Sequence, residues 1–561
     1  MIDRKMFGGK RVYHRPRFIA TDLASVTAAI AALTLRGGGV LTLPHMLALG
    51  STEQISIAAG SGSGIEFQGH PSGTTVTKNA GATPALVIGP GSIPTTVTAT
   101  LVEDNYQQGT DRISVVSATG LSVGNYYYLQ SDYVTPYPDG STNTLRVFIE
   151  LVRIKKITGT SITLEKPLAQ GWAGATMTLT AVSVSRNISF KNITISGNTS
   201  MDQAFFASHV DGLTFSGCTI GVANSSGIQI KGIRNLVMCR NAVSVKYDAA
   251  QGGFRYGINS SHTIGGTIVD TSGTNCESVV VLARGNVGIT VDGVTSGSNA
   301  KYDGDLHDWN QDTSWTRCST TVKWGNEAFP WAGKGHKISN CSLQLLAVVG
   351  GSSGCIAENC NIATMSFTSV GDAVAHPMCG ELTIHAPQLE INGGTCGTTN
   401  TAIWLTWRGG DGRLLMKNVT DIGRHSVQMA RKDFVYERQG GTSNSATYTH
   451  FEWSRNRSNP SNLSTVTANV EPDSNGNLEL RFFGIAMTQT GENRVGWAGN
   501  VTTGEWRITY DALATINGAL FGSLAASSRH NGLQPVASTN RDANYGSGSS
   551  SAWLPIAVPV L

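Results

Sequence analysis

The stretch Asn187-Ile-Ser-Phe-Lys-Asn-Ile-Thr-Ile-Ser-Gly197 contains the pattern that decides the fold. Apolar and polar residues alternate along it, which is typical of short strands, and each run ends at Asn or Gly. The same pattern returns at Gly212–Ile220, Gly288–Gly297, Lys337–Leu343 and Leu414–Thr420. The repeat is irregular, at roughly 20–30 residues, which fits coils with variable turns better than leucine-rich or propeller repeats. We therefore predict an all-β chain wound into a right-handed parallel β-helix.

The composition supports a solenoid. The chain has 561 residues with 66 glycines, and only 14% of them are charged. Many short strands joined by tight turns have this profile, and a solenoid can grow lengthwise around one core. The net charge of +3 comes from 41 basic and 38 acidic residues, which argues against a nucleic-acid-binding protein.

Six basic residues gather at the N-terminus: Arg4, Lys5, Lys10, Arg11, Arg15 and Arg17. This segment lacks the apolar core of a secretory signal, and no apolar run is long enough to span a bilayer. We expect a chain made in the cytoplasm without export and without membrane contact. Residues 1–20 are predicted to be an anchor that docks on another protein; the alternative is a solvated tail.

A short amphipathic helix is predicted over Asp22–Leu33, with Asp22 as its N-cap. Gly37-Gly-Gly-Val-Leu-Thr-Leu-Pro44 follows as a glycine turn and a strand. This start resembles the N-terminal cap and first coil of pectate-lyase-like β-helices, and such a start is common in bacteriophage tailspikes. A cap is required physically, because an open end would expose the core and unpaired strand edges. The cap and first coils are placed at residues 21–102, and the body of the β-helix at 181–434.

Two segments break the rhythm of the coils. Residues 103–180 alternate with period two and predict an antiparallel β insert, which resembles the small insert of many tailspikes. Its tyrosines, expected to build mainly the insert's own core, are Tyr126, Tyr127, Tyr128, Tyr133 and Tyr137. Residues 435–561 predict a separate β domain that ends in the apolar run Trp553–Leu561. Similar tailspikes are homotrimers with C-terminal intertwining modules, and an apolar terminus suits that role.

Nine cysteines occur between Cys218 and Cys396, without any C-x-x-C pair. The odd number and wide spacing oppose a disulfide framework and a zinc site. Four of them share a local context, and we predict that they are reduced and stack at equivalent corners of successive coils: Cys218, Cys318, Cys341 and Cys360.

The segment from Lys301 to Trp331 concentrates the residues that can do chemistry. Its catalytic candidates are Asp303, Asp305, His307, Asp308 and Glu327. Four tryptophans are predicted to stack on sugar rings: Trp309, Trp315, Trp324 and Trp331. Tyr302, and Glu277 and Arg284 from the preceding coil, are further substrate-binding candidates. Paired carboxylates are what glycoside hydrolysis needs. Asp305 and Asp308 would point to opposite faces of a strand, so their pairing requires a turn at Leu306–His307 and a projecting loop.

Alternatives remain open for this segment. Its Asp-x-His-Asp stretch resembles the Asp-x-His-Gly element of phage pectate-lyase-like proteins, with Asp308 in place of the glycine. A histidine or tyrosine beside an arginine can instead abstract the proton α to a uronic carboxyl, which is lyase chemistry. The aspartates can also be turn residues, and the tryptophans can pack a trimer seam. The motifs of polygalacturonases and the aspartates of calcium pectate lyases match poorly, and no cofactor or metal is predicted.

The resemblance implies a phage tailspike in the virion tail, attached through its N-terminus to a tail, baseplate or adaptor protein. We expect it to bind a bacterial surface polysaccharide and to depolymerise it, with hydrolysis slightly favoured because carboxylates are in excess. A purely adhesive receptor-binding spike and a bacterial polysaccharide-degrading enzyme are the alternatives.

Overall fold

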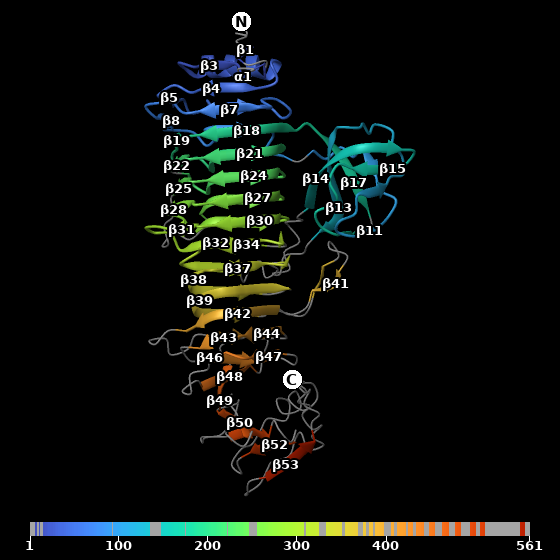
Figure 1. The fold of residues 1–561 in the computed structure, drawn as a ribbon, viewed down its shortest axis with the longest axis vertical. Coiled ribbons are helices and arrows are strands. Elements are labelled where there is room, and N and C mark those ends of the chain that lie inside the picture. Colours follow the sequence, from blue (N-terminus) through green and yellow to red (C-terminus); the bar gives the residue numbers. More distant parts are fainter. Residues whose placement is uncertain are drawn as a thin grey trace. The chain divides into compact units, whose positions relative to one another are not determined.

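The computed structural model consists almost entirely of short strands that stack into coils (Figure 1). It describes residues 15–134, 147–245, 255–324, 333–349 and 354–368, with gaps at residues 93, 174–175, 222 and 308–309. It also describes the N-terminal strands β1 (Met6–Phe7) and β2 (Lys10–Arg11), and after residue 368 the strands β40 to β53 with a few residues beside them. The chain divides into two compact units, with residues 1–320 in the first and most of the remainder in the second.

The first unit winds around three parallel sheets, so that each coil contributes one strand to each sheet. Sheet 1 contains β3 (Arg17–Ile19), β4 (Gly39–Thr42), β7 (Ile65–Gln68), β18 (Ser185–Lys191), β21 (Val210–Ser216), β24 (Arg234–Cys239), β27 (Ile264–Val269), β30 (Val287–Asp292) and β34 (Ser314–Thr316). Sheet 2 contains β5 (Met46–Leu49), β8 (Thr74–Lys78), β19 (Ile193–Ser196), β22 (Thr219–Gly221), β25 (Ala242–Ser244), β28 (Ser272–Thr274) and β31 (Thr295–Ser296). Sheet 3 contains β6 (Ile55–Ile57), β9 (Leu86–Ile88), β20 (Gln203–Ser208), β23 (Ser226–Lys231), β26 (Tyr256–Ser261), β29 (Ser278–Arg284) and β32 (Tyr302–Leu306). The predicted right-handed parallel β-helix is confirmed.

The length of the coils follows from the register of sheet 1. Asp211 pairs with Arg234, Arg234 with Ile264, and Ile264 with Val287, so that successive coils take 23, 30 and 23 residues. Turns of different length therefore separate strands that remain in register, as the irregular repeat predicts.

From β18 onwards, successive coils turn one corner with a residue in the left-handed backbone region. In the first unit these residues occupy one register column with φ between 49° and 64°: Asn192, Gly217, Arg240, Asp270, Gly293 and Arg317. The second unit has a column of its own: Asn340, Asn359, Gly393, Asn418 and Gly440. Gly and Asn adopt this conformation at low cost, which explains why the runs end at these residues.

Apolar side chains stack along the inside of the coils. The rings of Phe67, Phe190 and Phe215 form a ladder with centroid separations of 4.8 and 5.3 Å. Cys218, Cys318, Cys341 and Cys360 each follow a left-handed corner residue and are buried free thiols, which confirms the predicted corner positions. Burial raises the pKa of the Cys218 thiol, as expected of a small core residue.

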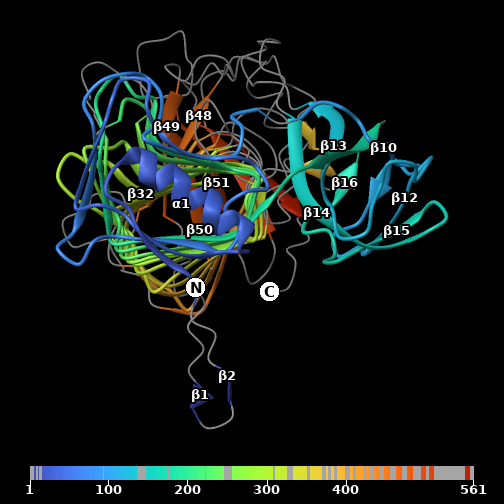
Figure 2. The ribbon, with the colours of Figure 1, turned by 90° about the horizontal axis from the view of Figure 1, so that it is seen from above.

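A helix covers the N-terminal end of the coils. Helix α1 (Leu23–Leu35) begins at the predicted cap, where Asp22 accepts from the Ser25 N–H at 2.7 Å and the Ser25 hydroxyl accepts from the Asp22 N–H. Seen from above, it lies across the end of the stack (Figure 2). Gly38 follows with φ of +117°, and a Cβ there would lie 2.6 Å from the Gly64 carbonyl, so the turn excludes larger residues.

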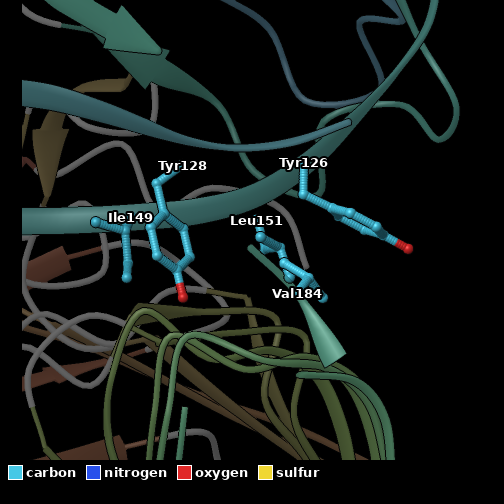
Figure 3. Packing of buried hydrophobic residues seen from close by; sticks show 5 residues of the cluster. All are labelled: Tyr126, Tyr128, Ile149, Leu151 and Val184. Carbon is cyan, nitrogen blue, oxygen red and sulfur yellow. The ribbon is translucent and has the colours of Figure 1, made fainter. Parts of the chain in front are cut away.

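The predicted insert is an antiparallel module. Its main sheet contains β10 (Ala99–Thr100), β12 (Arg112–Ser114), β13 (Tyr126–Val134), β14 (Val147–Thr158), β15 (Ser161–Leu164) and β17 (Met177–Val182), and β11 (Asn105–Tyr106) pairs with β16 (Trp172–Ala173). Tyr126, Tyr127 and Tyr128 are buried, as predicted, and Figure 3 shows the cluster that Tyr126 and Tyr128 form with aliphatic side chains. The side chain of Tyr133 and the whole of Tyr137 lie outside the described residues.

The insert is fastened to the coils by its tyrosines. The Tyr126 hydroxyl donates to Asp211 at 2.7 Å, and the Tyr128 hydroxyl donates to the carbonyl of Gly232 at 2.9 Å. The Tyr128 ring also meets the ring of His209 edge-on, with centroids 5.1 Å apart. These contacts hold the insert beside one corner of the β-helix.

The burial of His209 beside Tyr128 predicts that the protein loses stability in acid. His209 is buried, and its pKa is lowered to about 4, first by burial and second by the charge of Lys231. The unfolded chain binds a proton near the ordinary pKa, so this group destabilises the fold as the pH falls from 6.5 to about 4, by roughly 3 kcal/mol. His209→Asn, which tolerates the local φ of 56°, should flatten the pH dependence of the melting temperature in that window. The exposed His45→Asn is the control, and an unchanged slope in His209→Asn would contradict the assignment.

The second unit continues with parallel strands and then changes direction. Its parallel strands include β35 (Thr321–Trp324), β37 (Lys337–Ser339), β38 (Ser342–Val349), β39 (Cys355–Thr368), β42 (Gln388–Cys396), β43 (Leu405–Arg408), β44 (Gly412–Lys417), β46 (His425–Met429), β47 (Phe434–Gln439) and β48 (Tyr448–Ser454). An antiparallel series then follows: β49 (Leu463–Asn469), β50 (Asn477–Phe483), β51 (Arg494–Asn500), β52 (Glu505–Tyr510) and β53 (Ser550–Pro555). Strand β47 pairs in parallel with β44, and β48 pairs in parallel with β46, so parallel pairing extends beyond the predicted boundary at residue 434. Among the described residues, no helix is long and apolar enough to cross a membrane.

Candidate functional site

Strand β32 carries the centre of the site on the outer side of sheet 3. Gly304 points inward, because a Cβ at this position would lie 2.0 Å from the buried ring of Trp315. Leu306 is fully buried. Successive residues of a strand point to opposite faces, so Asp305 points outward, and so does His307 directly after the strand.

The turn predicted at Leu306–His307 is not formed. Strand β32 runs through Leu306, and the N–H of His307 still donates to the carbonyl of Leu282 on the neighbouring coil at 3.0 Å. Asp305 therefore lies on a strand and not on a projecting loop. Asp308, its predicted partner, lies outside the described residues.

Asp305 and His307 form a hydrogen-bonded pair. Nε2 of His307 lies 2.9 Å from Oδ2 of Asp305, and the two side chains are only 7% and 3% exposed. The ring of Tyr256, two coils away, meets the His307 ring edge-on at a centroid distance of 5.8 Å. A carboxylate that accepts from Nε2–H fixes the imidazole and makes Nδ1 the basic nitrogen. The pair therefore has the arrangement of an oriented general base.

Basic and hydroxyl groups lie on the coils beside this pair. Lys231, Ser261 and Arg284 are in register at the ends of β23, β26 and β29. All three are half-buried. The pKa of Lys231 is lowered, first by burial and second by the positive charge of Arg284. The end of sheet 3 therefore concentrates positive charge near the carboxylate–imidazole pair.

Polar side chains extend the same face. Gln229 and Asn259 are in register with Val281, which in turn is in register with Asp305. Both amides are half-buried. Parallel strands are about 4.8 Å apart, so these positions span about 14 Å along the axis of the coils. A row of amides, hydroxyls and charges is suited to binding the hydroxyl groups of an extended sugar chain.

An asparagine ladder fixes the backbone next to His307. Asn310 donates through Nδ2 to the carbonyl of His307 at 2.9 Å and to that of Leu282 at 3.0 Å. Asn286, one coil earlier, donates to Oδ1 of Asn310 at 2.8 Å. Asn286 and Asn310 thus stack on successive coils, and this ladder holds the end of β32 in place.

Asp303 has a structural role. It is fully buried, and its carboxylate accepts four hydrogen bonds, from the N–H and hydroxyl of Ser296 and from the N–H groups of Ser319 and Thr320, at 2.7–2.8 Å. These bonds tie together the corners of two coils. These contacts support a structural role for Asp303, and its predicted catalytic role stays a prediction.

The predicted tryptophan platform is not supported by the two tryptophans that the structure describes. Trp315 is fully buried, and its Nε1 donates to the Thr313 hydroxyl at 3.2 Å. Trp324, in the second unit, is also fully buried, with its ring 5.9 Å from that of His336. Neither indole can stack on a sugar from solvent, because both are used in packing.

Of the remaining candidates, the structure describes Tyr302 and Glu277. Tyr302 is half-buried at the start of β32, with the ammonium of Lys301 4.9 Å from its ring centroid. Glu277 is half-buried directly before β29. Asp308, Trp309, Glu327 and Trp331 lie outside the described residues, so their predicted roles stay predictions.

Two residues of the site were not among the candidates. Tyr256 and Lys231 occupy opposite ends of strands on the same sheet as Asp305. The sequence contains a pattern that could have identified Lys231. Two equivalent strands both end in a basic residue: Ser226-Gly-Ile-Gln-Ile-Lys231 and Ser278-Val-Val-Val-Leu-Ala-Arg284. No comparable signal marks Tyr256, whose ring contact crosses two coils.

Comparison with known proteins identifies the fold. No protein-family model and no curated protein matches the chain. Among solved structures, the tailspike gp61 of Pseudomonas phage phi297 matches with a TM-score of 0.52 at 11% identity, covering 85% of this chain and 89% of that one. The tailspike protein gp49 of Pseudomonas phage LKA1 matches with a TM-score of 0.47 at 14% identity, covering 75% and 72%. The Gp54 tailspike of Acinetobacter baumannii bacteriophage AP22, in complex with capsular saccharide, gives 0.44 at 11% identity, covering 82% of both. The likeness to the phi297 tailspike shows that this chain has the right-handed parallel β-helix of that protein.

Proposed function

We propose that this chain is a bacteriophage tailspike that binds a bacterial surface polysaccharide along sheet 3 and depolymerises it. The substrate class is a capsule, an exopolysaccharide or an O-antigen, and the place of action is the virion tail at the host surface. The observation that carries the proposal is the buried pair of Asp305 and His307 on the outer side of a strand. A buried carboxylate–imidazole pair beside polar side chains is typical of a catalytic site. The fold shared with the phi297 tailspike supports the biological setting.

Two chemistries fit the site. In a hydrolase, Asp305 would act with a second carboxylate, for which Asp308 and Glu327 are the candidates. In a lyase, His307, oriented by Asp305, would remove the proton α to a uronic carboxyl, with Tyr256 nearby. The hydrogen bond between Asp305 and His307 favours the lyase, because it prepares a base instead of leaving the carboxylate to act alone.

Digestion of purified capsule tests the proposal. The protein is expected to shorten the polymer, as size-exclusion chromatography will show, and mass spectrometry of the products separates the two chemistries. An unsaturated end, which is one water lighter, indicates a lyase, and a saturated end indicates a hydrolase. If the polymers of the host are bound but never shortened, the adhesive alternative is correct.

The N-terminal basic segment is proposed to attach the spike to the virion. The structure limits the deletion that can test this, because Arg17 belongs to β3 and the Pro16 carbonyl accepts from the N–H of Val40 at 2.8 Å. Removing residues 1–14 should leave cleavage of capsule unchanged and abolish incorporation into phage particles. Immunoblots of purified virions measure incorporation. A loss of soluble enzymatic activity in this variant would count against an attachment role.

A further inference from the structure

Lys231 is an unusual lysine for this chain. It is half-buried, and among the described residues its ammonium has neither an ion pair nor a side-chain hydrogen bond. Lysines elsewhere on the coils are paired, such as Lys191 with Glu66 at 3.0 Å and Lys417 with Glu390 at 3.0 Å. A partly desolvated ammonium without a counter-charge is costly and needs a reason.

The nearest strong influence on Lys231 is another cation. Arg284 lies two coils away in register, about 10 Å along the axis, and its charge opposes the charge of Lys231. Ser261 lies between them in register, with its hydroxyl on the same face. An anion bound between Lys231 and Arg284, next to the Ser261 hydroxyl, would relieve the repulsion between the two positive charges.

The position of these groups connects them to the proposed site. Arg284 ends β29, and the carbonyl of Leu282 on the same strand accepts from the N–H of His307. The cations therefore lie on the coils directly before the Asp305–His307 pair. A sugar residue held by its acidic group at Lys231 and Arg284 would have its neighbour along the polymer at that pair.

We propose that Lys231, Ser261 and Arg284 form a subsite for an anionic group, a carboxylate or a phosphate, on the repeating unit of the polysaccharide. This inference rests on the proposed function and narrows its substrate class to acidic polymers. The two cations neutralise the charge of this group, while the Ser261 hydroxyl between them donates to the carbonyl of Ile230 at 3.4 Å.

Binding to three classes of purified bacterial capsular polysaccharide tests the subsite: polymers with carboxylates, polymers with phosphates, and neutral polymers. Lys231→Gln should weaken binding of the acidic polymer at least tenfold, and Lys231→Arg should restore it. Chemical reduction of the carboxylates should abolish the effect if a carboxylate is the ligand. If Lys231→Gln weakens the binding of phosphate-bearing polymers alone, the ligand is a phosphate. Lys191→Gln, which removes a paired lysine on sheet 1, is the matched control and should bind as the wild type does.

The outcomes separate the subsite from the function on which it rests. If no polymer is bound or cleaved, the proposed function fails. If only neutral polymers are bound, or if Lys231→Gln binds an acidic polymer as tightly as the wild type, the subsite is wrong while the tailspike function stands. The melting temperature of Lys231→Gln should not fall, because the change removes a repulsion. A marked fall together with weaker binding of neutral polymers would show a structural role and overturn the subsite.

Discussion

Asp305→Asn is expected to lower the turnover of the polysaccharide by a factor of at least ~100. The amide keeps the shape of the side chain but removes the charge that orients and stabilises the imidazole of His307, 2.9 Å away. Binding of the polymer should survive, because the polar row of sheet 3 is untouched. Initial rates of viscosity loss give the turnover, and retention on immobilised polysaccharide gives the binding.

Asp303→Asn is the matched control, since Asp303 lies two residues away on the same strand. Its carboxylate accepts four hydrogen bonds, and an amide nitrogen facing those donors would lose some of them, at a cost of about 1–3 kcal/mol. We expect Asp303→Asn to lower the melting temperature and to retain turnover at temperatures where it stays folded. Near wild-type turnover in Asp305→Asn would remove Asp305 from the site.

His307→Gln distinguishes the two chemistries. If His307 is the base of a lyase, its substitution should be as severe as that of Asp305, because the two act as one unit. If Asp305 is a carboxylate of a hydrolase, His307→Gln should retain much more turnover than Asp305→Asn. This comparison of the two variants needs only a polymer that the wild type shortens, and the identity of its sugars need not be known.

The fold was predictable because its determinants are local. Alternation in Ile188–Phe190 defines a strand, and Asn192 marks the corner at which φ is positive. The same signals recur along the coils, so a strand or corner that is predicted wrongly in one coil does not change the predicted fold. The position of Asp22 as a helix cap is equally local. The point at which parallel pairing ends was predicted too early, because strand alternation looks alike in parallel and antiparallel sheets.

The site was predictable only in part. Asp305 and His307 are two residues apart, so an extended chain places them on one side, and their segment was recognised by its composition. The ring of Tyr256 contacts that of His307 only because three coils are stacked in register. That register depends on turn lengths that the sequence does not reveal. The burial of Trp315 also depends on register, since its ring fills the space left by Gly304. A cluster of tryptophans indicates packing as readily as sugar binding.

Residues after Ser454 are expected to be required for assembly. The parallel pattern ends with β48, so a chain that stops at Ser454 retains every described parallel strand and loses the antiparallel series β49 to β53. It also loses the apolar run from Trp553 to Leu561, for which we predict a role in assembly. We propose that the full chain is a homotrimer held by this region. Light scattering should give the mass of a trimer for the full chain and that of a monomer, or aggregate, for the truncated one.

Aggregation alone would be ambiguous, because a truncated β-helix also exposes the edge of its last coil. Val558→Asp avoids this problem, since it places one charge in the apolar run and keeps the strands β49 to β53 that follow the last parallel strand. If the run is buried between subunits, an unpaired charge there should shift the mass from trimer towards monomer while the coils keep their strand signal in circular dichroism. A stable trimer from both the Ser454 truncation and Val558→Asp would contradict the proposal. Assembly would then have to come from the coils themselves.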